Sequence, residues 1–407
     1  MQPAKPPLGS GENFDVAAAE LVSRLFHDIV EEGCVVFLGA GCTTERTRKG
    51  SKSFYEHIKH LSGHPGGEPS PSFPELMEYF CDRVDGGRHN RLIREALSRI
   101  EYFSTPGEEN RFATAVGSAL AEIPYFNRFV TTNWDPFLER SLGVLVATVE
   151  DRDLAFWDDR KRQVLKIHGC ITRPYSIVAT QSDYEQCMKR NPLIFNKLKD
   201  LMATKAFLFA GYSMQDSDFQ QVWEGIIASL GHFSKLAYAL APHSTAERIS
   251  FWKERGIQIY KISDLAFMSA LREKLEGEGL IARKEFLQFL RREEARIVSL
   301  HLQLDQNSPG GLASAMYQDG LLHGLEDVLT AADIGTKKRE NFESELMQLQ
   351  RDLANERKQD SLIEIAYLSG RCEAIIRFSK RAEEPIPAYF HPYGLRPVRK
   401  FVRGDKF

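Results

Sequence analysis

The sequence predicts an α/β fold, in which helices cover both faces of a parallel sheet, followed by an α-helical C-terminal region. The first part rests on six short apolar runs within residues 34–261, several of which are separated by helical patterns. Strands that alternate with helices form parallel sheets with both faces covered. The second part rests on residues 276–384, where strand patterns stop and helical spacing of apolar residues continues.

The composition is that of a folded protein, not of a disordered chain or a general polyanion binder. The chain has 407 residues, of which 43% are hydrophobic and 11% aromatic, enough to bury a sizeable core. At roughly 100–200 residues per domain, this length predicts two or three domains. The 53 Lys and Arg residues are offset by 56 Asp and Glu residues, so the net charge is only -3, which argues against general nucleic-acid binding.

Apolar runs and cysteine spacing predict a soluble, cytoplasmic protein without a membrane segment. Runs such as 35–40 and 206–211 are far shorter than the ~20 residues that cross a bilayer. Residues 1–7 have no apolar stretch behind their lysine and do not look like a secretory signal. The six cysteines form no C-x-x-C pair, so we expect buried, reduced thiols with neither a disulfide framework nor a zinc ribbon.

The N-terminal part is predicted to begin with a flexible segment and a helix. Residues 1–14 are rich in proline and glycine, and Asp15 is expected to cap a helix that runs to about Glu32 and ends at Gly33. Prolines and glycines predict a loop at 62–74. Helical patterns then continue to about residue 123.

The six apolar runs are predicted to be buried strands of one parallel sheet. They comprise residues 34–38, 129–132, 164–167, 206–210, 235–240 and 256–261. Helical spacing between them is clearest at 193–202 and 219–230. Together with the N-terminal helix, these elements define a predicted domain over residues 15–275.

Residues 276–384 are predicted to form a helical domain for assembly or partner binding. One long helix is expected at 286–304, ended by the segment 308–311. Another helix carries an apolar stripe that we expect to pack into the core of this domain. The stripe consists of Phe342, Leu346, Leu349 and Leu353.

Residues 385–407 form a basic, aromatic tail. Short charged termini are usually solvated, and this is one interpretation of the tail. The alternative is docking on a neighbouring subunit or partner, because the tail is rich in aromatic residues. These are Tyr389, Phe390, Tyr393, Phe401 and Phe407.

Four of the predicted strands end in glycine or polar residues, and ligands bind at the carboxyl ends of strands in open parallel sheets. The first strand is followed by Gly39, Ala40 and Gly41, and then by Cys42 and Thr43. Two glycines allow a close backbone approach to a pyrophosphate, although an ordinary turn is the alternative. The motif is neither the dinucleotide fingerprint G-x-G-x-x-G nor a P-loop.

The next two strand ends carry an amide, a carboxylate and an imidazole. Thr132, Asn133 and Asp135 follow the second strand, and their side chains suit a ribose hydroxyl, a water or a carboxamide. The alternative is an Asp-Pro turn in which Asn133 caps the next helix. His168 follows the third strand and is a candidate general base, although most histidines have structural roles.

The fourth strand end consists of Gly211, Tyr212 and Ser213. The glycine permits close approach of a ligand, and the serine hydroxyl suits a sugar or a phosphate. The alternative is an ordinary strand-to-helix turn in which Ser213 is the N-cap.

In their order and spacing, the four strand ends resemble the sirtuin-like domain, over roughly residues 30–265. The resemblance implies a Rossmann-like core that binds NAD+ as substrate and cleaves its nicotinamide–ribose bond, with no metal. It implies that Asn133 positions the nicotinamide ribose or the attacking water, that Asp135 contacts the carboxamide, and that His168 is the general base. The residues implied to bind NAD+ are Gly39, Ala40, Gly41, Cys42, Thr43, Thr132, Gly211, Tyr212 and Ser213.

Departures from the protein-deacetylating sirtuins point to water as the acceptor. Those enzymes carry a zinc module with two C-x-x-C pairs, whereas here Cys170 and Cys187 stand alone between His168 and Gly211. The stretch after Gly41 also lacks their G-I-P-D-F-R signature. The resemblance therefore implies an NAD+ hydrolase and not a deacylase.

The sequence looks most like the zinc-free sirtuin-like domains of bacterial anti-phage systems, which deplete NAD+ in abortive infection. Among these it is most similar to the stand-alone subunit that partners a HerA-type ATPase, which implies a homo-oligomer and such a partner. The alternative is a non-catalytic subunit that senses NAD+ or ADP-ribose and regulates a partner ATPase or nuclease. A role in DNA processing is suggested only by the tail.

Overall fold

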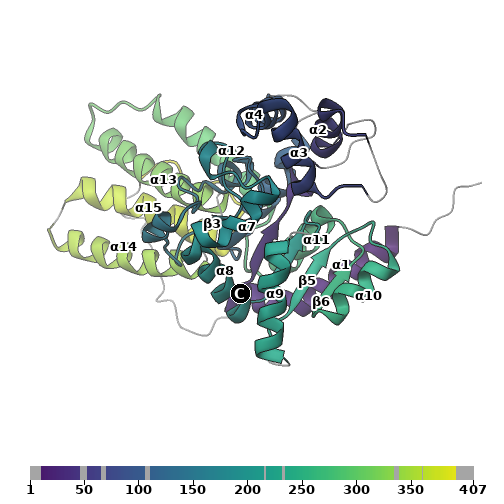
Figure 1. Cartoon of the computed structure of the whole chain (residues 1–407). Coiled ribbons are helices and arrows are strands. Elements are labelled where there is room, and N and C mark those ends of the chain that lie inside the picture. Colours follow the sequence, from purple (N-terminus) through teal and green to yellow (C-terminus); the bar gives the residue numbers. More distant parts are fainter. Residues whose placement is uncertain are drawn as a thin grey trace, which may run out of the picture. The chain divides into compact units, whose positions relative to one another are not determined.

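The computed structural model describes residues 11–45, 53–65, 70–105, 111–214, 217–231, 234–333, 339–359 and 361–390. The chain divides into two compact units, unit 1 (Met1–Arg272) and unit 2 (Glu273–Phe407). Figure 1 shows the elements of both units along the chain, and each unit is described by itself below. The functions assigned to the predicted domains 15–275 and 276–384 stay predictions.

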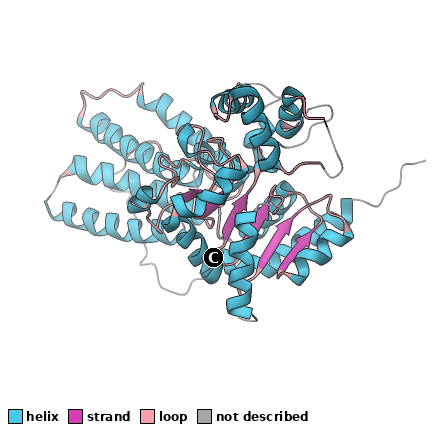
Figure 2. Ribbon diagram, in the orientation of Figure 1, coloured by secondary structure: helices cyan, strands magenta, loops and turns pink. Residues whose placement is uncertain are grey.

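Unit 1 contains a parallel sheet of six strands in the order β3-β2-β1-β4-β5-β6 (Figure 2). The strands are β1 (Val35–Leu38), β2 (Arg128–Thr131), β3 (Gln163–Lys166), β4 (Phe207–Ala210), β5 (Ala237–Leu240) and β6 (Ile257–Tyr260). Each predicted apolar run forms one strand, so the predicted α/β fold class is confirmed. This strand order is that of the doubly wound dinucleotide-binding fold, in which the order reverses between the first and fourth strands.

Helices connect the strands and cover the sheet. The helical elements that accompany it are α1 (Gly11–His27), η1 (Asp28–Glu32), η2 (Ala40–Cys42), α2 (Phe54–Ser62), α3 (Phe73–Asp85), α4 (Asn90–Ser104), α5 (Arg111–Ala121), α6 (Phe137–Leu142), η4 (Asp151–Phe156), η5 (Pro174–Ser176), α7 (Gln181–Arg190), α8 (Pro192–Thr204), α9 (Ser217–Leu230), α10 (Ala246–Glu254) and α11 (Asp264–Gly277). Figure 2 shows these helices in cyan around the magenta strands.

The first helix begins earlier than predicted. It starts at Gly11, so Asp15 lies inside the helix and does not cap it, and residues 11–14 are helical. The last proline before this point is Pro7, so no proline lies inside the helix. Gly33 ends the helix as predicted, with a φ of +84° that favours glycine. Residues 1–10 lie outside the described residues.

Both faces of the sheet are buried. On one face the rings of Phe37 and Phe209 lie 5.4 Å apart, and Phe219 of α9 packs edge-on against both. On the other face Val36 and Leu208 are fully buried as well. Burial on both faces explains why the strands are continuous apolar runs and do not alternate with polar residues.

Between β1 and β2, the helices α2, α3 and α4 form a helical layer whose core cluster also includes Phe137 of α6 and residues of the segment 171–179. Phe80 and Leu92 are among its buried residues. The predicted loop 62–74 ends at Ser72, whose backbone N–H donates to the Glu75 carboxylate at 2.7 Å in a capping box. Pro74 therefore lies in the first turn of α3, where proline is tolerated.

The strand register places the carboxyl ends of β1 to β4 side by side. Leu38, the last residue of β1, is opposite Thr131 of β2 and Ala210 of β4. Thr131 is in turn opposite Lys166 of β3. The four strand-end motifs singled out in the sequence therefore emerge together at one edge of the sheet.

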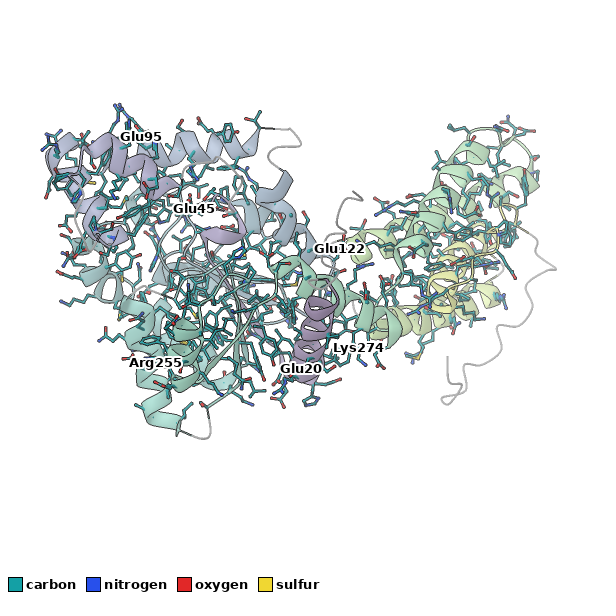
Figure 3. The ribbon with its side chains drawn as sticks, turned by 90° about the vertical axis from the view of Figure 1, so that its right-hand side faces the viewer. Glu20, Glu45, Glu95, Glu122, Arg255 and Lys274 are labelled. Carbon is teal, nitrogen blue, oxygen red and sulfur yellow. The ribbon has the colours of Figure 1, made fainter. Side chains whose placement is uncertain are left out.

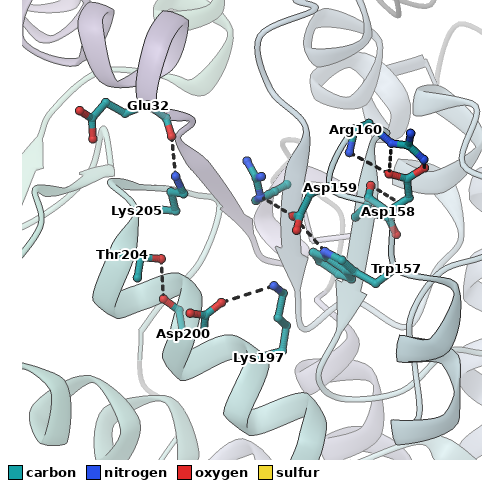
Figure 4. A network of polar contacts seen from close by, with 11 residues as sticks. Glu32, Trp157, Asp158, Asp159, Arg160, Lys197, Asp200, Thr204 and Lys205 are labelled. Atoms are coloured by element: carbon teal, nitrogen blue, oxygen red, sulfur yellow. Dashed lines mark hydrogen bonds and ion pairs between the residues drawn. The ribbon is translucent and has the colours of Figure 1, made fainter.

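The opposite, amino-terminal edge carries a polar network at the surface (Figure 4). Lys205 Nζ donates to the Glu32 carbonyl at 2.7 Å. Asp159 accepts from Trp157 Nε1 and from Arg128 Nε at 3.1 Å each. Exposed pairs of this kind contribute about 0–1 kcal/mol each, so this network adds little to the stability of unit 1.

Unit 2 is helical, which confirms the predicted C-terminal region. Its helices beyond α11 are α12 (Lys284–His301), α13 (Pro309–Asp333), α14 (Arg339–Gln359) and α15 (Leu362–Lys380). The predicted stripe of Phe342, Leu346, Leu349 and Leu353 is buried. The segment 308–311 does not end α12, which stops at His301; it begins α13, because Ser308 Oγ accepts from the Gly311 N–H at 3.1 Å.

The described part of the tail packs on unit 2 itself. The Phe390 ring lies 6.0 Å from that of Tyr317, and the Ile386 N–H donates to Glu293 Oε2 at 2.7 Å. Phe390 is therefore buried in its own unit, whereas the neighbouring Tyr389 is 51% exposed. The other aromatic residues of the tail beyond this point, and its basic run, lie outside the described residues.

Three further features concern membranes, thiols and metals. Across the described residues, none of the helices combines the length and hydropathy needed to span a bilayer. The six cysteines are all buried and none forms a disulfide, as predicted. In the same described residues, no group of three or more histidine, cysteine or acidic side chains is placed to hold a metal ion.

Candidate active site

A cavity of about 340 Å³ lies at the carboxyl ends of β1 to β4, where the strand order reverses. Its size falls in the range of small-molecule sites. The strand-end turns line one side, with Ala40, Gly41, Thr44, Glu45, Thr132, Asn133, Asp135, His168, Gly211 and Ser213. Mostly apolar and aromatic residues line the rest, with Phe54, Tyr55, Phe73, Ala96, Arg99, Ile100, Trp134, Val178, Tyr184 and Tyr212.

Most of the predicted site residues meet in this cavity. Those in its lining are Ala40, Gly41, Thr132, Asn133, Asp135, His168, Gly211, Tyr212 and Ser213. Gly39, Cys42 and Thr43 belong to the same turn as Gly41 but lie outside the lining. Their roles toward a ligand, like those of the lining residues, stay predictions.

The turns after β1 and β4 are in backbone contact, and this contact accounts for their glycines. The Gly41 N–H donates to the Gly211 carbonyl at 3.0 Å, and a Cβ on Gly41 would lie 2.8 Å from the same oxygen. A Cβ on Gly39 would overlap that oxygen too. At Gly211, φ is +58° and a Cβ would overlap the Cys42 nitrogen. Packing of the two turns therefore requires these glycines, whatever they contribute to ligand binding.

Asn133 is anchored on one side and has an unsatisfied oxygen on the other. Its Nδ2 donates to the Gly39 carbonyl at 3.2 Å and to Thr43 Oγ1 at 3.0 Å. Because a carbonyl only accepts, Gly39 fixes which amide atom is which. The residue is 6% exposed, and its Oδ1 is buried with no hydrogen-bond partner among the described residues. A buried acceptor in a cavity wall is a natural partner for a ligand hydroxyl or a water.

Asp135 is buried, and both of its carboxylate oxygens accept hydrogen bonds within the protein. Oδ2 accepts from Thr43 Oγ1 at 2.8 Å, and Oδ1 accepts from the Phe137 N–H at 3.1 Å. Burial raises the pKa of Asp135, and the nearby charge of Lys166 limits the rise. Asp135 therefore satisfies the first turn of α6, so the alternative in which Asn133 caps this helix is wrong.

A buried ion pair between Lys166 and Glu139 lies next to Asp135. The Lys166 side chain is 0% exposed, and its Nζ lies 2.8 Å from Glu139 Oε1 and donates to the Asp135 carbonyl at 2.7 Å. In the sequence, Lys166 is one polar residue in an apolar strand. Nothing there indicates that its amine meets a carboxylate on α6.

His168 is 2% exposed and lies in the cavity wall. Its Nδ1 is 3.4 Å from Tyr184 Oη, and the two ring centroids are 4.8 Å apart. Gly169 has a φ of +86° and turns the chain there, and the His168 carbonyl accepts from the Val178 N–H at 3.1 Å. The backbone and one side of the ring are thus held in place beside the cavity.

The turn after β4 is fixed by stacking and by an arginine. Tyr212 stacks on Phe37 with the ring centroids 4.4 Å apart. The Ser213 carbonyl accepts from Arg248 Nη2 at 2.7 Å. Helix α9 begins at Ser217, so the alternative in which Ser213 is its N-cap is wrong.

Several cavity residues were not predicted. Arg99 on α4 pairs with Glu45 at 2.9 Å. Figure 3 labels Glu45, and it also labels Glu95, which lies on α4 as Arg99 does. Trp134 lies between Phe54 and Phe73, with ring centroids 6.0 Å from each. In the sequence, Arg99 is an ordinary residue of a helical stretch, and Phe73 lies in the predicted loop 62–74. Glu45 and Phe54 follow Gly41 with no motif to single them out. Trp134 lies inside the motif after the second strand, between Asn133 and Asp135, but was not assigned a role.

A doubly wound sheet with a cavity at the reversal of its strand order is the arrangement typical of dinucleotide-binding α/β domains. Comparison with known families shows which family of α/β domains this region resembles. Residues 127–260, which include β2 to β6, match the SIR2-like domain. This match confirms the sirtuin-like resemblance over these residues.

Relatives named NAD(+) hydrolase ThsA are similar to about half of this chain. The protein from Cytobacillus dafuensis is 24% identical over 229 residues, which cover 54% of this chain and 43% of the relative. The protein from Bacillus cereus (strain MSX-D12) is 26% identical over 223 residues, covering 52% and 44%. The chain thus spans less than half the length of these curated relatives.

The contact between the two turns predicts a large loss of stability in Gly211→Ala. A matched control is Gly143→Ala, where φ is +67° but a Cβ would meet nothing within 4 Å. The control should cost about 1–2 kcal/mol for its backbone conformation alone, and Gly211→Ala should cost about 1–3 kcal/mol more for overpacking. Urea unfolding followed by tryptophan fluorescence measures this, because the 4 tryptophans all lie in unit 1. Equal losses for the two variants would show that the turns are not tightly packed.

The buried pair predicts that Lys166→Met destabilises unit 1 because it leaves the Glu139 carboxylate without its partner. Breaking a buried pair in this way costs about 3–5 kcal/mol. The double variant Lys166→Met, Glu139→Leu should recover most of the loss, since no buried charge remains. The same fluorescence measurement compares them. If the double variant is no more stable than the single one, the ion pair is not the cause.

Proposed function

We propose that this chain hydrolyses NAD+ to nicotinamide and ADP-ribose. The observation that carries the proposal is the presence of Asn133 and His168 in one cavity, at the carboxyl edge of the sheet in a SIR2-like domain. The names of the similar NAD(+) hydrolases support it.

The chemistry of the cavity suits the nicotinamide ribose. Asn133 Oδ1 is a buried acceptor without a partner among the described residues, and a ribose hydroxyl or a water would satisfy it. Trp134, Phe54 and Phe73 supply an aromatic wall suited to a planar ring. A wall of this kind also keeps bulk water away from the reacting centre.

In the proposed reaction, the bond between ribose C1′ and the pyridinium nitrogen breaks, and its electron pair stays with the nicotinamide. The ring becomes neutral, and positive charge develops on the ribosyl centre. A water oxygen then bonds to C1′, and His168 takes the proton that this water loses. Asn133 Oδ1 orients the ribose hydroxyl or the water. The products are nicotinamide, ADP-ribose and one proton.

The other predicted residues are assigned to substrate binding. The turn of Gly39, Ala40, Gly41, Cys42 and Thr43, with Thr132, lies near the diphosphate. Gly211, Tyr212 and Ser213 lie on the adenosine side. Asp135 faces the carboxamide, and its bond to Thr43 also keeps Asn133 in place.

The cellular role in this proposal is depletion of cytoplasmic NAD+ as the effector of an anti-phage system. The similar hydrolases and the separate helical unit support it. Unit 2 forms a homo-oligomer or binds a HerA-type ATPase, which keeps the hydrolase restrained until infection is sensed.

The test is release of nicotinamide from NAD+ by the purified full chain. His168→Ala and Asn133→Ala should each lower the rate by about 10²–10⁴-fold, since general-base and positioning contributions are of this size. Matched controls are His60→Ala and Asn196→Ala, which change exposed residues on α2 and α8 and should leave the rate unchanged.

Two outcomes would contradict the proposal. Unchanged turnover in His168→Ala and Asn133→Ala would move catalysis away from this cavity. A wild-type chain that binds ADP-ribose but releases no nicotinamide, alone or with a co-expressed ATPase, would favour a non-catalytic sensor of the ligand.

A further inference from the structure

Arg99 brings a positive charge into the cavity from the helical layer α2–α4. Its Nη2 lies 2.9 Å from Glu45 Oε1 and donates to the Thr44 carbonyl at 2.9 Å. The guanidinium lies over the Phe103 ring at 5.4 Å. Its side chain is 19% exposed, so part of it remains accessible from the cavity.

The cavity otherwise has little to offer a dianionic group. Among its described lining residues, Arg99 is the single arginine or lysine, and two of the others, Glu45 and Asp135, are acidic. Lys166 is fully buried behind Asp135 and is not part of the lining. A diphosphate carries two negative charges, and a guanidinium is the side chain best suited to bind phosphate oxygens in pairs.

Most backbone N–H groups of the turn after β1 already donate hydrogen bonds within the protein. The N–H groups of Gly39, Gly41, Cys42 and Thr43 all donate to backbone carbonyls. A diphosphate beside this turn therefore gains little from those amides in the observed conformation. A charged donor from outside the turn therefore adds more to diphosphate binding than these four amides do.

The Glu45 carboxylate pairs with the Arg99 guanidinium. Its Oε2 accepts from the Phe54 N–H at 3.0 Å, while Oε1 faces the guanidinium. Burial raises the pKa of Glu45, and the charge of Arg99 opposes this rise. The carboxylate is thus held in a partly buried site mainly by its pairing with Arg99.

We propose that Arg99 binds the diphosphate of the dinucleotide substrate and that the Glu45 carboxylate occupies its guanidinium until the substrate enters. This inference rests on the proposed function, because it assigns a residue to the binding of the same substrate. Arg99 and Glu45 then act in opposite directions on affinity: one attracts the diphosphate and the other competes with it. A merely structural salt bridge would behave differently, because losing either partner would have the same effect.

The test is calorimetric titration of the full chain with ADP-ribose, which retains the diphosphate and needs no turnover. Arg99→Gln should weaken binding by about ten- to a hundredfold, the effect of losing hydrogen bonds to a charged group. Glu45→Gln should bind ADP-ribose at least as tightly as the wild type. Arg91→Gln is the matched control, since Arg91 is an exposed arginine of the same helix, paired with Glu95, and it should have no effect.

A second readout separates diphosphate recognition from damage to the fold. For Arg99→Gln, kcat/KM for NAD+ should fall by the same factor as ADP-ribose binding. The rate on nicotinamide riboside, which lacks the diphosphate, should stay unchanged relative to the wild type. Arg99→Lys should recover part of the affinity, because it keeps the charge but not the planar pair of donors.

The inference is overturned if Arg99→Gln binds ADP-ribose as tightly as the wild type, or if Glu45→Gln weakens binding as much as Arg99→Gln does. It is also overturned if the wild-type chain does not bind ADP-ribose. Failure of the proposed function is a different result: normal ADP-ribose binding without nicotinamide release, or release that does not depend on His168.

Discussion

The backbone contact between the turns after β1 and β4 is the constraint on which the site depends. These turns flank the point where the strand order reverses, so they must pass each other without side chains between them. Gly39, Gly41 and Gly211 meet this requirement, and a Cβ at any of them would collide with the facing backbone. The contact fixes the position of the residues that follow Gly41, and Thr43 is among them. The polar residues Asn133 and Asp135 are in turn hydrogen-bonded to Thr43.

Thr43 links the turn after β1 to the two polar residues after β2 through hydrogen bonds. It receives a hydrogen bond from Asn133 and gives one to Asp135, so the three side chains hold one another. Lys166, which is paired with Glu139, donates a hydrogen bond to the Asp135 carbonyl. This half of the site is carried by the sheet strands and the turns that follow them. The other half, with Arg99 and most of the aromatic wall, comes mainly from the helical layer α2–α4. The proposed exchange at Arg99 therefore involves a side chain of the helical layer and not one of the residues bonded to Asn133.

The fold was predictable because strands buried on both faces are continuous apolar runs, and each of the six runs forms a strand. Ends of helices were harder to place. Asp15 looks like a cap but lies inside a helix that starts at Gly11. The segment 308–311 looks like the end of one helix and is the beginning of the next. In both cases the same polar or glycine-rich residues suit either end of a helix, and only packing decides between them.

The sequence by itself determined the type of sheet and the four strand ends where polar residues gather, since apolar runs and the residues that follow them are local features. It also indicated a sirtuin-like domain, because the order of the motifs is preserved along the chain. Tertiary structure decided what each residue touches. It showed that the glycines serve a contact between two turns, that Lys166 is paired with Glu139 inside the core, and that Arg99 reaches the cavity from a helix far along the chain. These are long-range contacts between single side chains, and the residues involved carry no local pattern that distinguishes them from ordinary helix or strand positions.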